Sequence, residues 1–576
     1  MAKTRWKLQD IQDEYAVKSL ADSLNITDVL ARLLILRNIK SFTQAKSFFR
    51  PSIDSLHNPF LMDGMDTATM RTIKAVTENE KICIFGDYDV DGTCATALLY
   101  LFLKELDANI DFYIPKRLTE GYGLSAAGVD HVKSIGATLL IAVDCGITAI
   151  EETEYANKLG IDVIICDHHQ PKEILPNAFA VLDPLKPSCG YPFKYLSGAG
   201  IAFKLAQGVA DRIGKRILPL KYLDLVAFAG AADIVPLSDE NRILVKEGLN
   251  IVNNDPRPGI EALIESAGIR PGALTSGQIV FTIAPRINAV GRLGDAHRAV
   301  DLLITENKDE ALQLAQVLET ENYERRKLDV DTFDNALTLV ESSLDLQNEL
   351  AIILHQQDWH PGVIGIVASR LVEKYYRPTI MLTTVDGVAK GSARSISKFN
   401  IYEALRKCED LLIHFGGHRA AAGLAVEVDK LEEFRTRFNN IVKESLLKDD
   451  LFPEITIDSK IKFSEITPKF LRILEQFSPF GHGNMRPVFL CEDVKVANPP
   501  RIVGTNHLLV TLKQDGCEKV FDCIGFNMGN FCEGIARNNS KIDIVFSIDK
   551  TVRDGRFFPQ FKFKDIRIKE KIEELV

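Results

Sequence analysis

The sequence predicts an α/β protein in which a parallel-sheet domain is joined by a long helix to a second α/β domain, followed by a small β-barrel. Three observations carry this prediction. From about residue 81 to 235, apolar strand-like segments alternate with helical segments, which is typical of a parallel sheet covered by helices. More than thirty residues after Asn307 contain neither Gly nor Pro, and beyond about residue 454 short alternating strands follow at the spacing of a barrel.

The length implies several domains, because a chain of 576 residues is too long for one hydrophobic core. We expect an N-terminal helical segment that covers the sheet, the parallel-sheet domain with a helical extension, the long connecting helix, the second α/β domain and the barrel. Their expected boundaries are residues 1–60, 61–300, 301–348, 349–450 and 451–576. At the start of the long helix, Asn307 and Glu310 form a predicted capping pair.

Composition excludes several classes of protein. No apolar run approaches the roughly 18 residues that a membrane span requires, and the first residues, MAKTRWKLQD, have no apolar signal core. The ten cysteines include no C-x-x-C pair, which favours reduced thiols, so we expect a soluble cytoplasmic protein without a membrane partner. A net charge of −10, from 69 basic and 79 acidic residues, argues against a histone-like coat of nucleic acid but permits a local basic groove.

Acidic side chains and histidines follow three of the predicted buried strands. The strand KICIF is followed by GDYDVDG, the strand ATLLIAV by DCGIT, and the strand DVIIC by DHHQP. The carboxyl ends of neighbouring parallel strands meet at one edge of a sheet, so these side chains are expected to converge. They are Asp87, Asp89, Asp91, Asp144, Asp167, His168 and His169. Converging carboxylates repel one another unless a cation neutralises them.

Two simpler interpretations compete with a metal site. DYDVDG matches the first half of a calcium-binding EF-hand loop, but the twelfth position of that loop is Leu98 instead of Glu, and the motif follows a strand. A single Asp at a strand end is more often a helix cap than a ligand. Because acidic residues follow three separate strands, a metal site is favoured over these two interpretations. Such a carboxylate-rich set suits two octahedral ions, Mn²⁺ or Mg²⁺, which would cleave a phosphate ester.

These motifs carry a resemblance to a known family. GDYDVDG, VDCGI, CDHHQP and AADIVPL resemble the successive motifs of the DHH phosphoesterase superfamily, and GSARS and FGGHRAAAG resemble its associated DHHA1 domain. With YIPKRLTEGYGLS, APRINAVGRLG, WHPGVIGIVASRL and FSPFGHGN, the chain closely resembles the bacterial single-strand-specific exonucleases of this superfamily. The resemblance implies a metal-dependent hydrolase that removes nucleotides from the 5′ end of single-stranded DNA, in the 5′ to 3′ direction, in DNA recombination and repair.

The resemblance also implies roles for individual residues. Carried onto matching positions, the metal ligands are Asp87, Asp89, Asp144, His168 and Asp233, the last in AADIVPL. Asp91 and Asp167 are expected either to orient these ligands by hydrogen bonds or to touch the scissile phosphate. His169 is expected to act on the scissile phosphate, either as an acid or as a substrate contact.

Positive residues are expected to bind the DNA backbone. APRINAVGR supplies Arg286, Asn288 and Arg292, and guanidinium groups have the fork geometry that suits phosphate oxygens. By resemblance, Ser392 and Arg394 of GSARS engage the 5′-terminal phosphate together with Arg117. His360 of the DWHPG motif would be structural on the sequence alone, but its place in a family motif implies substrate contact. In FGGHRAAAG, the residues Gly416, Gly417 and His418 are expected to form a phosphate-binding turn before an alanine-rich helix.

The C-terminal barrel resembles an OB-fold, which commonly binds single strands with basic and aromatic side chains. Phe561 and Phe563 alternate with Lys562 and Lys564, so this segment is either a contact surface for nucleic acid or a half-buried strand with a solvated outer side. By family analogy, the partners are a single-strand-binding protein and a helicase. Two alternative functions remain: a DHH-type phosphatase or nanoRNase acting on short oligonucleotides or small nucleotides, and a catalytically inactive DNA-binding scaffold.

Overall fold

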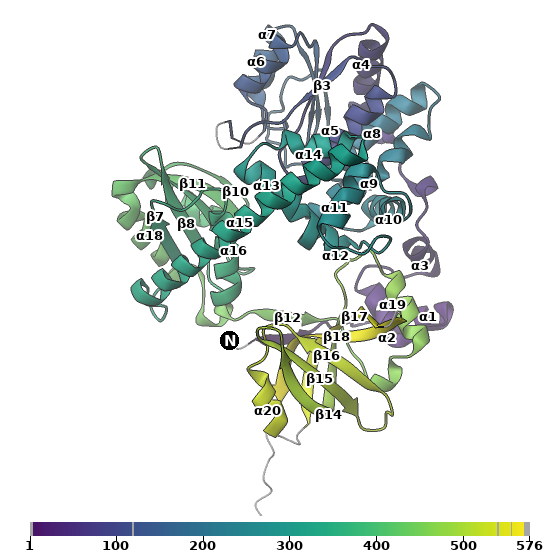
Figure 1. Ribbon diagram of the computed structural model, residues 1–576, viewed down its shortest axis with the longest axis vertical. Helices are drawn as coiled ribbons and strands as arrows, with labels where there is room; N and C mark the ends of the chain where they lie inside the picture. Colours follow the sequence, from purple (N-terminus) through teal and green to yellow (C-terminus); the bar gives the residue numbers. More distant parts are fainter. Residues whose placement is uncertain (1–3, 118–119, 122, 538–540, 554–555, 570–576) are drawn as a thin grey trace, which may run out of the picture. The chain divides into compact units, whose positions relative to one another are not determined.

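The computed structural model describes residues 4–117, 120–121, 123–537, 541–553 and 556–569 (Figure 1). The chain divides into two compact units. Unit 1 contains Asn58–Asp233 and Gly248–Pro453, and unit 2 contains Thr4–His57, Ile234–Glu247 and the chain from Glu454 onward. The segment Ile234–Glu247 therefore leaves unit 1 directly after Asp233, and the chain returns to unit 1 within helix α10 (Asp239–Asn254).

A five-stranded parallel sheet forms the centre of the first α/β part of unit 1. Its strand order is β3-β2-β4-β5-β6, so the three strands that precede the acidic motifs, β2, β4 and β5, are neighbours. Their adjacency confirms the predicted parallel sheet. The strands are β2 (Ile82–Phe85), β3 (Ile110–Tyr113), β4 (Leu139–Val143), β5 (Asp162–Cys166) and β6 (Ala180–Leu182). Every residue of β2 and β4 is buried, which explains their unbroken apolar sequences.

Helices cover both faces of this sheet (Figure 1). On one face, α6 (Ala126–Ser134) and α7 (Ile150–Lys158) pack against the sheet through a shared apolar core that includes Val129, Ala156 and Leu140. On the other face lie α4 (Met65–Thr77), α5 (Val90–Lys104) and α8 (Gly198–Arg212), and α8 contacts both α4 and α5. The carboxyl ends of the strands are left to the loops, as in other open α/β sheets.

A helical extension leads to the second α/β part. It consists of α9 (Leu223–Ala232), the end of α10, α11 (Pro258–Ser266), α12 (Ser276–Gln278), a π-helical turn at Ile279–Ile283, α13 (Ala284–Leu293) and α14 (His297–Ile304). The long helix α15 (Lys308–Ser343) follows and packs against α11, α13 and α14, and further along its length against α16. The Asn307 side chain caps α15 by accepting the N–H groups of Asp309 and Glu310. The Glu310 carboxylate binds the Thr305 hydroxyl.

The second α/β part of unit 1 contains a mixed sheet with the order β10-β11-β9-β8-β7. Its elements are β7 (Ile352–Gln356), α16 (Ile364–Tyr375), β8 (Thr379–Val385), β9 (Val388–Arg394), α17 (Ile401–Arg406), β10 (Leu412–Gly417), β11 (Ala421–Glu427) and α18 (Leu431–Ser445). The alanine-rich helix predicted after Gly417 is wrong. That stretch forms the hairpin of β10 and β11, because its small residues pair with β9 in an antiparallel ladder.

Unit 2 contains the predicted β-barrel. Strands β14 (Val488–Val503), β15 (His507–Gln514), β16 (Val520–Gly525), β18 (Arg556–Ile568) and β17 (Ile542–Arg553) pair in that order, and β17 also pairs with β14, which closes the barrel. The short strand β13 (Ser459–Lys460) adds to β14. α19 (Pro468–Gln476) precedes β14, and α20 (Phe531–Arg537) lies between β16 and β17.

The aromatic residues of β18 fill the barrel. Phe561 is 0% exposed and stacks between Phe521 and Phe546, with ring centroids 4.6 and 4.3 Å away, and Phe563 is also buried. Lys564 is exposed. Of the two interpretations of this segment, the half-buried strand is therefore correct, and the phenylalanine rings are core residues instead of platforms for nucleobases.

The N-terminal segment packs against the barrel instead of the parallel sheet. Helices α1 (Glu14–Leu24), α2 (Asp28–Ile35) and α3 (Phe42–Phe49) contribute Leu20, Leu30 and Ala45 to the apolar core that contains Phe489 and Phe546. Strand β1 (Arg5–Leu8) pairs in parallel with β12 (Glu454–Ile457). The expectation that the first residues cover the sheet is wrong, because an amphipathic helix does not reveal which apolar surface it covers.

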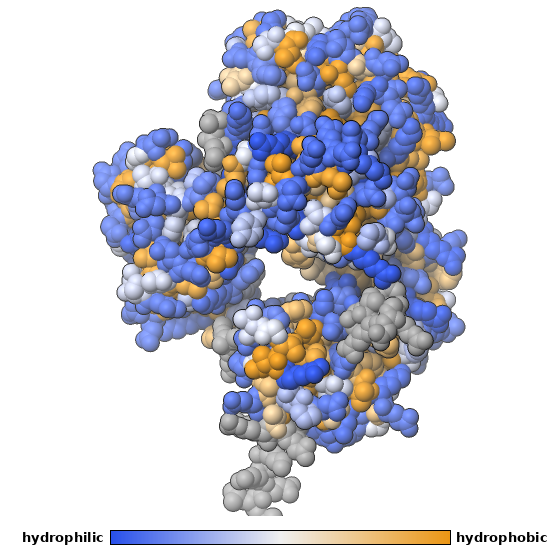
Figure 2. Space-filling view, viewed as in Figure 1, coloured by the Kyte–Doolittle hydropathy of each residue, from blue (hydrophilic) through white to orange (hydrophobic). Residues whose placement is uncertain are grey.

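The surface seen in Figure 2 is mostly hydrophilic, with separate apolar spots. Among the described residues, no helix is both long and apolar enough to span a membrane. Each of the ten cysteines is a free thiol, and eight of them are buried. The cysteines therefore act as small core residues, as their spacing predicts.

Candidate metal centre

The acidic motifs converge at the carboxyl edge of the parallel sheet. The loop after β2 carries Asp87, Asp89 and Asp91, the loop after β4 begins with Asp144, and the loop after β5 carries the DHH motif. The C-terminus of α9 adds Asp233. Ligand atoms of Asp87, Asp89 and Asp144 lie within 4.8 Å of one another, and so do those of Asp91, His168 and Asp233, and those of Asp144, His168 and His169.

Helix N-termini hold the carboxylates that follow β2. Asp89 caps α5, since its side chain accepts the N–H groups of Asp91 and Gly92 at 3.0 and 3.1 Å. Asp91 points to the start of α8, where it accepts the N–H groups of Gly198 and Ala199 at 2.6 and 2.8 Å. The positive end of α8 therefore stabilises the Asp91 carboxylate. Both of its oxygens are thus engaged by backbone amides.

Asp144 has a strained backbone and a close neighbour. Its φ is 60°, in the left-handed region that non-glycine residues adopt rarely, and its side chain is almost completely buried. A Cβ atom at Gly198 would come within 2.6 Å of Asp144 Oδ1, so only glycine fits at the start of α8. Backbone strain at a buried carboxylate is typical of a functional site.

In the DHH motif, Asp167 fixes the loop by hydrogen bonds, and His168 and His169 supply two imidazole rings. Asp167 Oδ1 accepts the backbone N–H of His168 at 2.8 Å and the Nδ1–H of His169 at 2.7 Å, while Asp167 Oδ2 accepts the N–H of Ile147 at 2.9 Å. Asp167 thus fixes the loop and the ring of His169 together.

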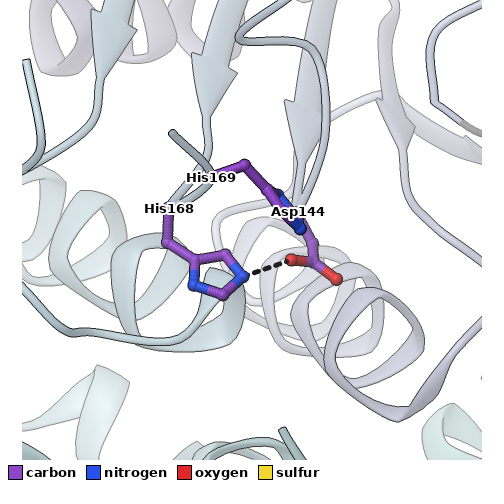
Figure 3. A group of neighbouring side chains, drawn as sticks. All are labelled: Asp144, His168 and His169. Atoms are coloured by element: carbon purple, nitrogen blue, oxygen red, sulfur yellow. Dashed lines mark ion pairs between the residues drawn. The ribbon is translucent and has the colours of Figure 1, made fainter. Parts of the chain in front are cut away.

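The ring of His168 points toward the carboxylate of Asp144 (Figure 3). Its Nε2 atom lies 3.1 Å from Asp144 Oδ1, 3.6 Å from Asp233 Oδ2 and 3.8 Å from Asp91 Oδ2. Burial lowers the pKa of His168 and outweighs the surrounding carboxylates. A neutral imidazole is the form that binds a metal ion.

The carboxylates repel one another strongly without a cation. Burial, followed by the charges of the neighbouring carboxylates, raises the pKa values of Asp87, Asp91 and Asp144 well above their usual range, and burial also raises that of Asp89. Asp87 Oδ1 is buried and has no hydrogen-bond partner among the described residues. A divalent ion would satisfy this oxygen and neutralise the cluster, so the donor set fits Mn²⁺ or Mg²⁺.

The pKa of His169 is shifted in the opposite direction from that of His168. Burial lowers its pKa, but the hydrogen bond to Asp167 and the charges of nearby carboxylates outweigh burial and raise the pKa to about 9. His169 therefore carries a proton at neutral pH in the metal-free protein.

A cluster of arginines lies close to the acidic loop. Arg117 lies over the ring of Tyr88, 5.0 Å from its centroid, and Tyr88 stands between Asp87 and Asp89 in the sequence. Burial, then the charges of Arg117, Arg325 and Arg394, lower the pKa of Arg292 to about 10. Burial and the charge of Arg117 also lower the pKa of Arg394. Such mutual repulsion marks a site that an anion would stabilise.

Ser392 and Arg394 lie on β9 beside the start of α16. Arg394 Nη1 donates to the Ser392 hydroxyl at 3.0 Å, and a Cβ atom at Gly365 would come within 2.8 Å of Ser392 Oγ. Arg292 reaches the same region, because its Nη1 donates to the Gly362 carbonyl at 3.1 Å. The Gly362 N–H donates to His360 Nδ1 at 3.0 Å, so His360 shapes this turn. The structure thus brings together the predicted residues of the phosphate site.

Two other predicted substrate residues, Arg286 and Asn288, have structural contacts, and three more lie at the β10–β11 hairpin. Arg286 is 5% exposed and forms an ion pair with Glu319 of α15, so its guanidinium is engaged in joining α13 to the long helix. Asn288 accepts the N–H of Val90 at 3.1 Å and thereby supports the start of α5. Gly416, Gly417 and His418 are exposed at the β10–β11 hairpin on the edge of the second sheet.

Two functional features were not predicted from the sequence. Arg325, on α15, adds a fourth positive charge to the arginine cluster. Gly198 and Ala199 provide the amides that bind Asp91. The motif Ser197-Gly198-Ala199-Gly200 does carry a helix-start signal, since Ser197 caps α8, but nothing in it indicates which carboxylate the helix faces.

Comparison with known proteins agrees with this architecture. The DHH family, N-terminal domain, matches residues 81–229, the DHHA1 domain matches 347–444, and the RecJ OB domain matches 457–565. The chain is 40% identical to the single-stranded-DNA-specific exonuclease RecJ of Bacillus subtilis (strain 168) over 574 residues, which cover 99% of this chain and 71% of that protein.

Solved structures match as well. The crystal structure of RecJ from Thermus thermophilus in complex with Mn²⁺ matches with a TM-score of 0.84 and 29% identity, covering 98% of this chain and 80% of that chain. The Mg²⁺ complex of RecJ from the same organism matches with a TM-score of 0.77 and 27% identity, covering 98% of this chain and 79% of that chain.

Proposed function

Since the chain belongs to the RecJ family of single-stranded-DNA-specific exonucleases, we propose that its acidic site removes nucleotides one at a time from the 5′ end of single-stranded DNA. The observation that carries this proposal is the convergence of Asp87, Asp89, Asp144, His168 and Asp233 at one sheet edge, where their ligand atoms form overlapping groups. These five residues follow different elements of the chain, so the site exists only when the sheet is folded.

Two cations, Mn²⁺ or Mg²⁺, would lower the pKa of an attacking water and stabilise the charge that develops on the scissile phosphate. Asp87 and Asp89 would hold one ion, His168 and Asp233 would hold the other, and Asp144 lies within reach of both groups. Asp91 is bound to the start of α8 and orients the loop from behind. Asp144 would thus be the carboxylate that both groups share.

His169 holds a proton in the metal-free protein, and its ring lies beside that of His168. Its Nδ1–H is fixed by Asp167, so the ring presents Nε2 in a defined direction. A protonated Nε2 would donate to an oxygen of the scissile phosphate or to the leaving 3′ oxygen. Removal of the Asp167 carboxylate would lower the pKa of His169 and loosen its ring.

The arginine cluster gives the reaction its direction. Arg117, Arg292 and Arg394 repel one another in the free protein, and a 5′-terminal phosphate would relieve this repulsion while accepting bonds from Ser392 and the guanidinium groups. A strand whose end is bound there would place its first phosphodiester near the acidic site, since the charge of Arg117 also acts on Asp87. Cleavage would then proceed from the 5′ end.

The decisive experiment follows products over time on end-labelled single strands, with Mn²⁺, Mg²⁺ or a chelator, and with a 5′-phosphate or a 5′-hydroxyl. We expect mononucleotides from the first time point when the strand carries a 5′-phosphate and metal is present. Release only from short oligonucleotides would favour a DHH-type phosphatase or nanoRNase, and binding without release would favour an inactive scaffold. A blunt duplex of the same sequence tests strand selectivity.

The cellular setting is part of the same proposal. Free thiols throughout the core support a reducing compartment, which we take to be the cytoplasm. An enzyme that acts on single strands needs a supply of them, so a helicase and a single-strand-binding protein are its expected partners. Co-purification with either protein from the native cell, abolished by deletion of the partner gene, tests this expectation.

A further inference from the structure

Two polar side chains of the long helix lie buried in the region of the arginine cluster. Asn322 and Arg325 are three residues apart on α15, so they lie on the same face of the helix. Asn322 is 0% exposed and Arg325 is 9% exposed. Buried polar groups usually have hydrogen-bond partners, because an unpaired group loses the bonds that water would supply. The contacts of this pair therefore bear directly on its role.

The two side chains satisfy each other only in part. Arg325 Nη2 donates to Asn322 Oδ1 at 2.7 Å. The amide nitrogen of Asn322, Nδ2, is buried and has no hydrogen-bond partner among the described residues. A guanidinium carries further N–H donors, and within the described part of the chain the side chain of Arg325 donates to Asn322 alone. The pair therefore presents unused N–H donors.

The end of α13 brings this pair close to Arg292. A Cβ atom at Gly294 would come within 2.7 Å of Glu321 Oε2, so the two helices meet at this level. Arg292 lies two residues before this contact on α13, and Asn322 lies one residue after it on α15. The charge of Arg325 contributes to the lowered pKa of Arg292, which agrees with this proximity. Asn322 and Arg325 thus belong to the same cluster as Arg292.

The carboxylates near the pair are bound to other arginines. Asp329, whose charge acts on Arg325, forms an ion pair with Arg370 of α16 at 3.2 Å. Glu321 forms an ion pair with Arg298. Burial is the largest influence on the pKa of Arg325 and lowers it. A buried guanidinium in this setting is stabilised by an anion that binds from outside the chain.

We propose that Arg325 and Asn322 bind the terminal phosphate of the DNA strand. The guanidinium donates to a phosphate oxygen, while Asn322 positions the guanidinium through Oδ1 and donates a further bond through Nδ2. The long helix then takes part in recognising the strand end, in addition to joining the two α/β parts. This inference rests on the proposed function in taking the cluster of Arg292, Ser392 and Arg394 as the phosphate site.

The test measures binding of single-stranded DNA to the full chain by fluorescence anisotropy, with a chelator present so that no cleavage occurs. Two strands of one sequence are compared, one with a 5′-phosphate and one with a 5′-hydroxyl. The ratio of their dissociation constants gives the factor by which the 5′-phosphate tightens binding. We expect Arg325→Gln to lower this factor about tenfold, the lower range for loss of a charge-assisted hydrogen bond.

Arg326→Gln is the matched control for the loss of charge. Arg326 is the next residue of α15, and its side chain is exposed, so the substitution removes the same charge from the surface of the helix. A general effect of charge on DNA binding acts on both strands alike and cancels in the ratio. We therefore expect Arg326→Gln to leave the preference for a 5′-phosphate unchanged.

Asn322→Asp separates a role in binding from a role in packing. The aspartate keeps an acceptor for Arg325, so thermal unfolding of the variant should stay close to that of wild type. It loses the Nδ2 donor and its charge repels a phosphate, so the preference for a 5′-phosphate should fall about tenfold or more. Full retention of the preference in this variant would mean that Asn322 has only a packing role.

Two results separate this inference from the proposed function. If Arg325→Gln and Asn322→Asp both retain the preference that Arg394→Ala loses, α15 takes no part in recognising the strand end, while the proposed phosphate site stands. If wild type itself binds the two strands equally well, the arginine cluster is not a site for the terminal phosphate, and that part of the proposed function is wrong.

Discussion

His168 Nε2 lies 3.1 Å from Asp144 Oδ1, although the two residues follow different strands of the sheet. The contact exists because β4 and β5 are paired in parallel, so that the residues after Val143 and Cys166 leave the sheet at the same edge. A neutral imidazole and a buried carboxylate at this distance can both bind the same cation.

Replacement of Asp144 by Ala should lower turnover by roughly a thousandfold or more, as loss of a directly acting group does. Binding of single-stranded DNA should change little, because the arginine cluster remains. Single-turnover kinetics and fluorescence anisotropy measure the two quantities on one preparation. Retention of full activity would remove Asp144 from the metal site.

Replacement of Arg394 by Ala should raise KM for 5′-phosphorylated strands by roughly 10- to 100-fold, the value of one or two charge-assisted hydrogen bonds. Strands with a 5′-hydroxyl should be affected less. Arg406→Ala is the matched control, since Arg406 lies in the same α/β part and pairs with Glu403 on the surface. An unchanged KM for phosphorylated ends would contradict the assignment.

Asp183 should make the stability of the protein depend on pH. It follows β6, and burial raises its pKa to about 7, so the folded state holds a proton that the unfolded state loses above about pH 4. Its stabilising effect is therefore complete below about pH 4 and lost as pH rises to about 7. Asp183→Asn should remove this dependence and stabilise the protein by up to roughly 4 kcal/mol at pH 8.

Denaturant titrations between pH 4 and pH 8, with a metal chelator present, measure how the free energy of unfolding depends on pH. The variant and wild type should have similar free energies of unfolding at the acidic end and diverge as pH rises. Parallel curves over the whole range would mean that Asp183 is ionised in the folded protein.

Phe561→Ala should destabilise unit 2 by about 3 to 5 kcal/mol, because it leaves a cavity between Phe521 and Phe546. Lys564→Ala, on the exposed side of the same strand, should leave stability unchanged within about 0.5 kcal/mol. Chemical unfolding monitored by circular dichroism compares them. Equal stability of wild type and Phe561→Ala would place this ring outside the core.

The sequence predicts the centre of the site well because each ligand lies close in sequence to the strand that positions it. Asp87, Asp144 and His168 each follow an apolar strand within a few residues, and the rule that parallel strands end at one edge brings them together. Long-range partners are not predictable in this way. Arg286 pairs with Glu319, and Leu30 packs into the barrel core, through contacts that no spacing reveals.

The wrong prediction after Gly417 has a different cause. Ala420, Ala421 and Ala422 favour a helix by intrinsic propensity, but the ladder with β9 overrides it. Likewise, Phe561 and Lys562 alternate as they would on either a binding face or a half-buried strand, and only the closed barrel decides between them.

The most direct test of the metal centre is anomalous diffraction at the manganese edge from crystals grown with Mn²⁺. The account predicts two peaks at the carboxyl edge of the parallel sheet, one within bonding distance of Asp87 and Asp89 and one within bonding distance of His168 and Asp233, with Asp144 near both. Crystals that contain Mn²⁺ elsewhere and show no peak beside Asp144 would contradict it.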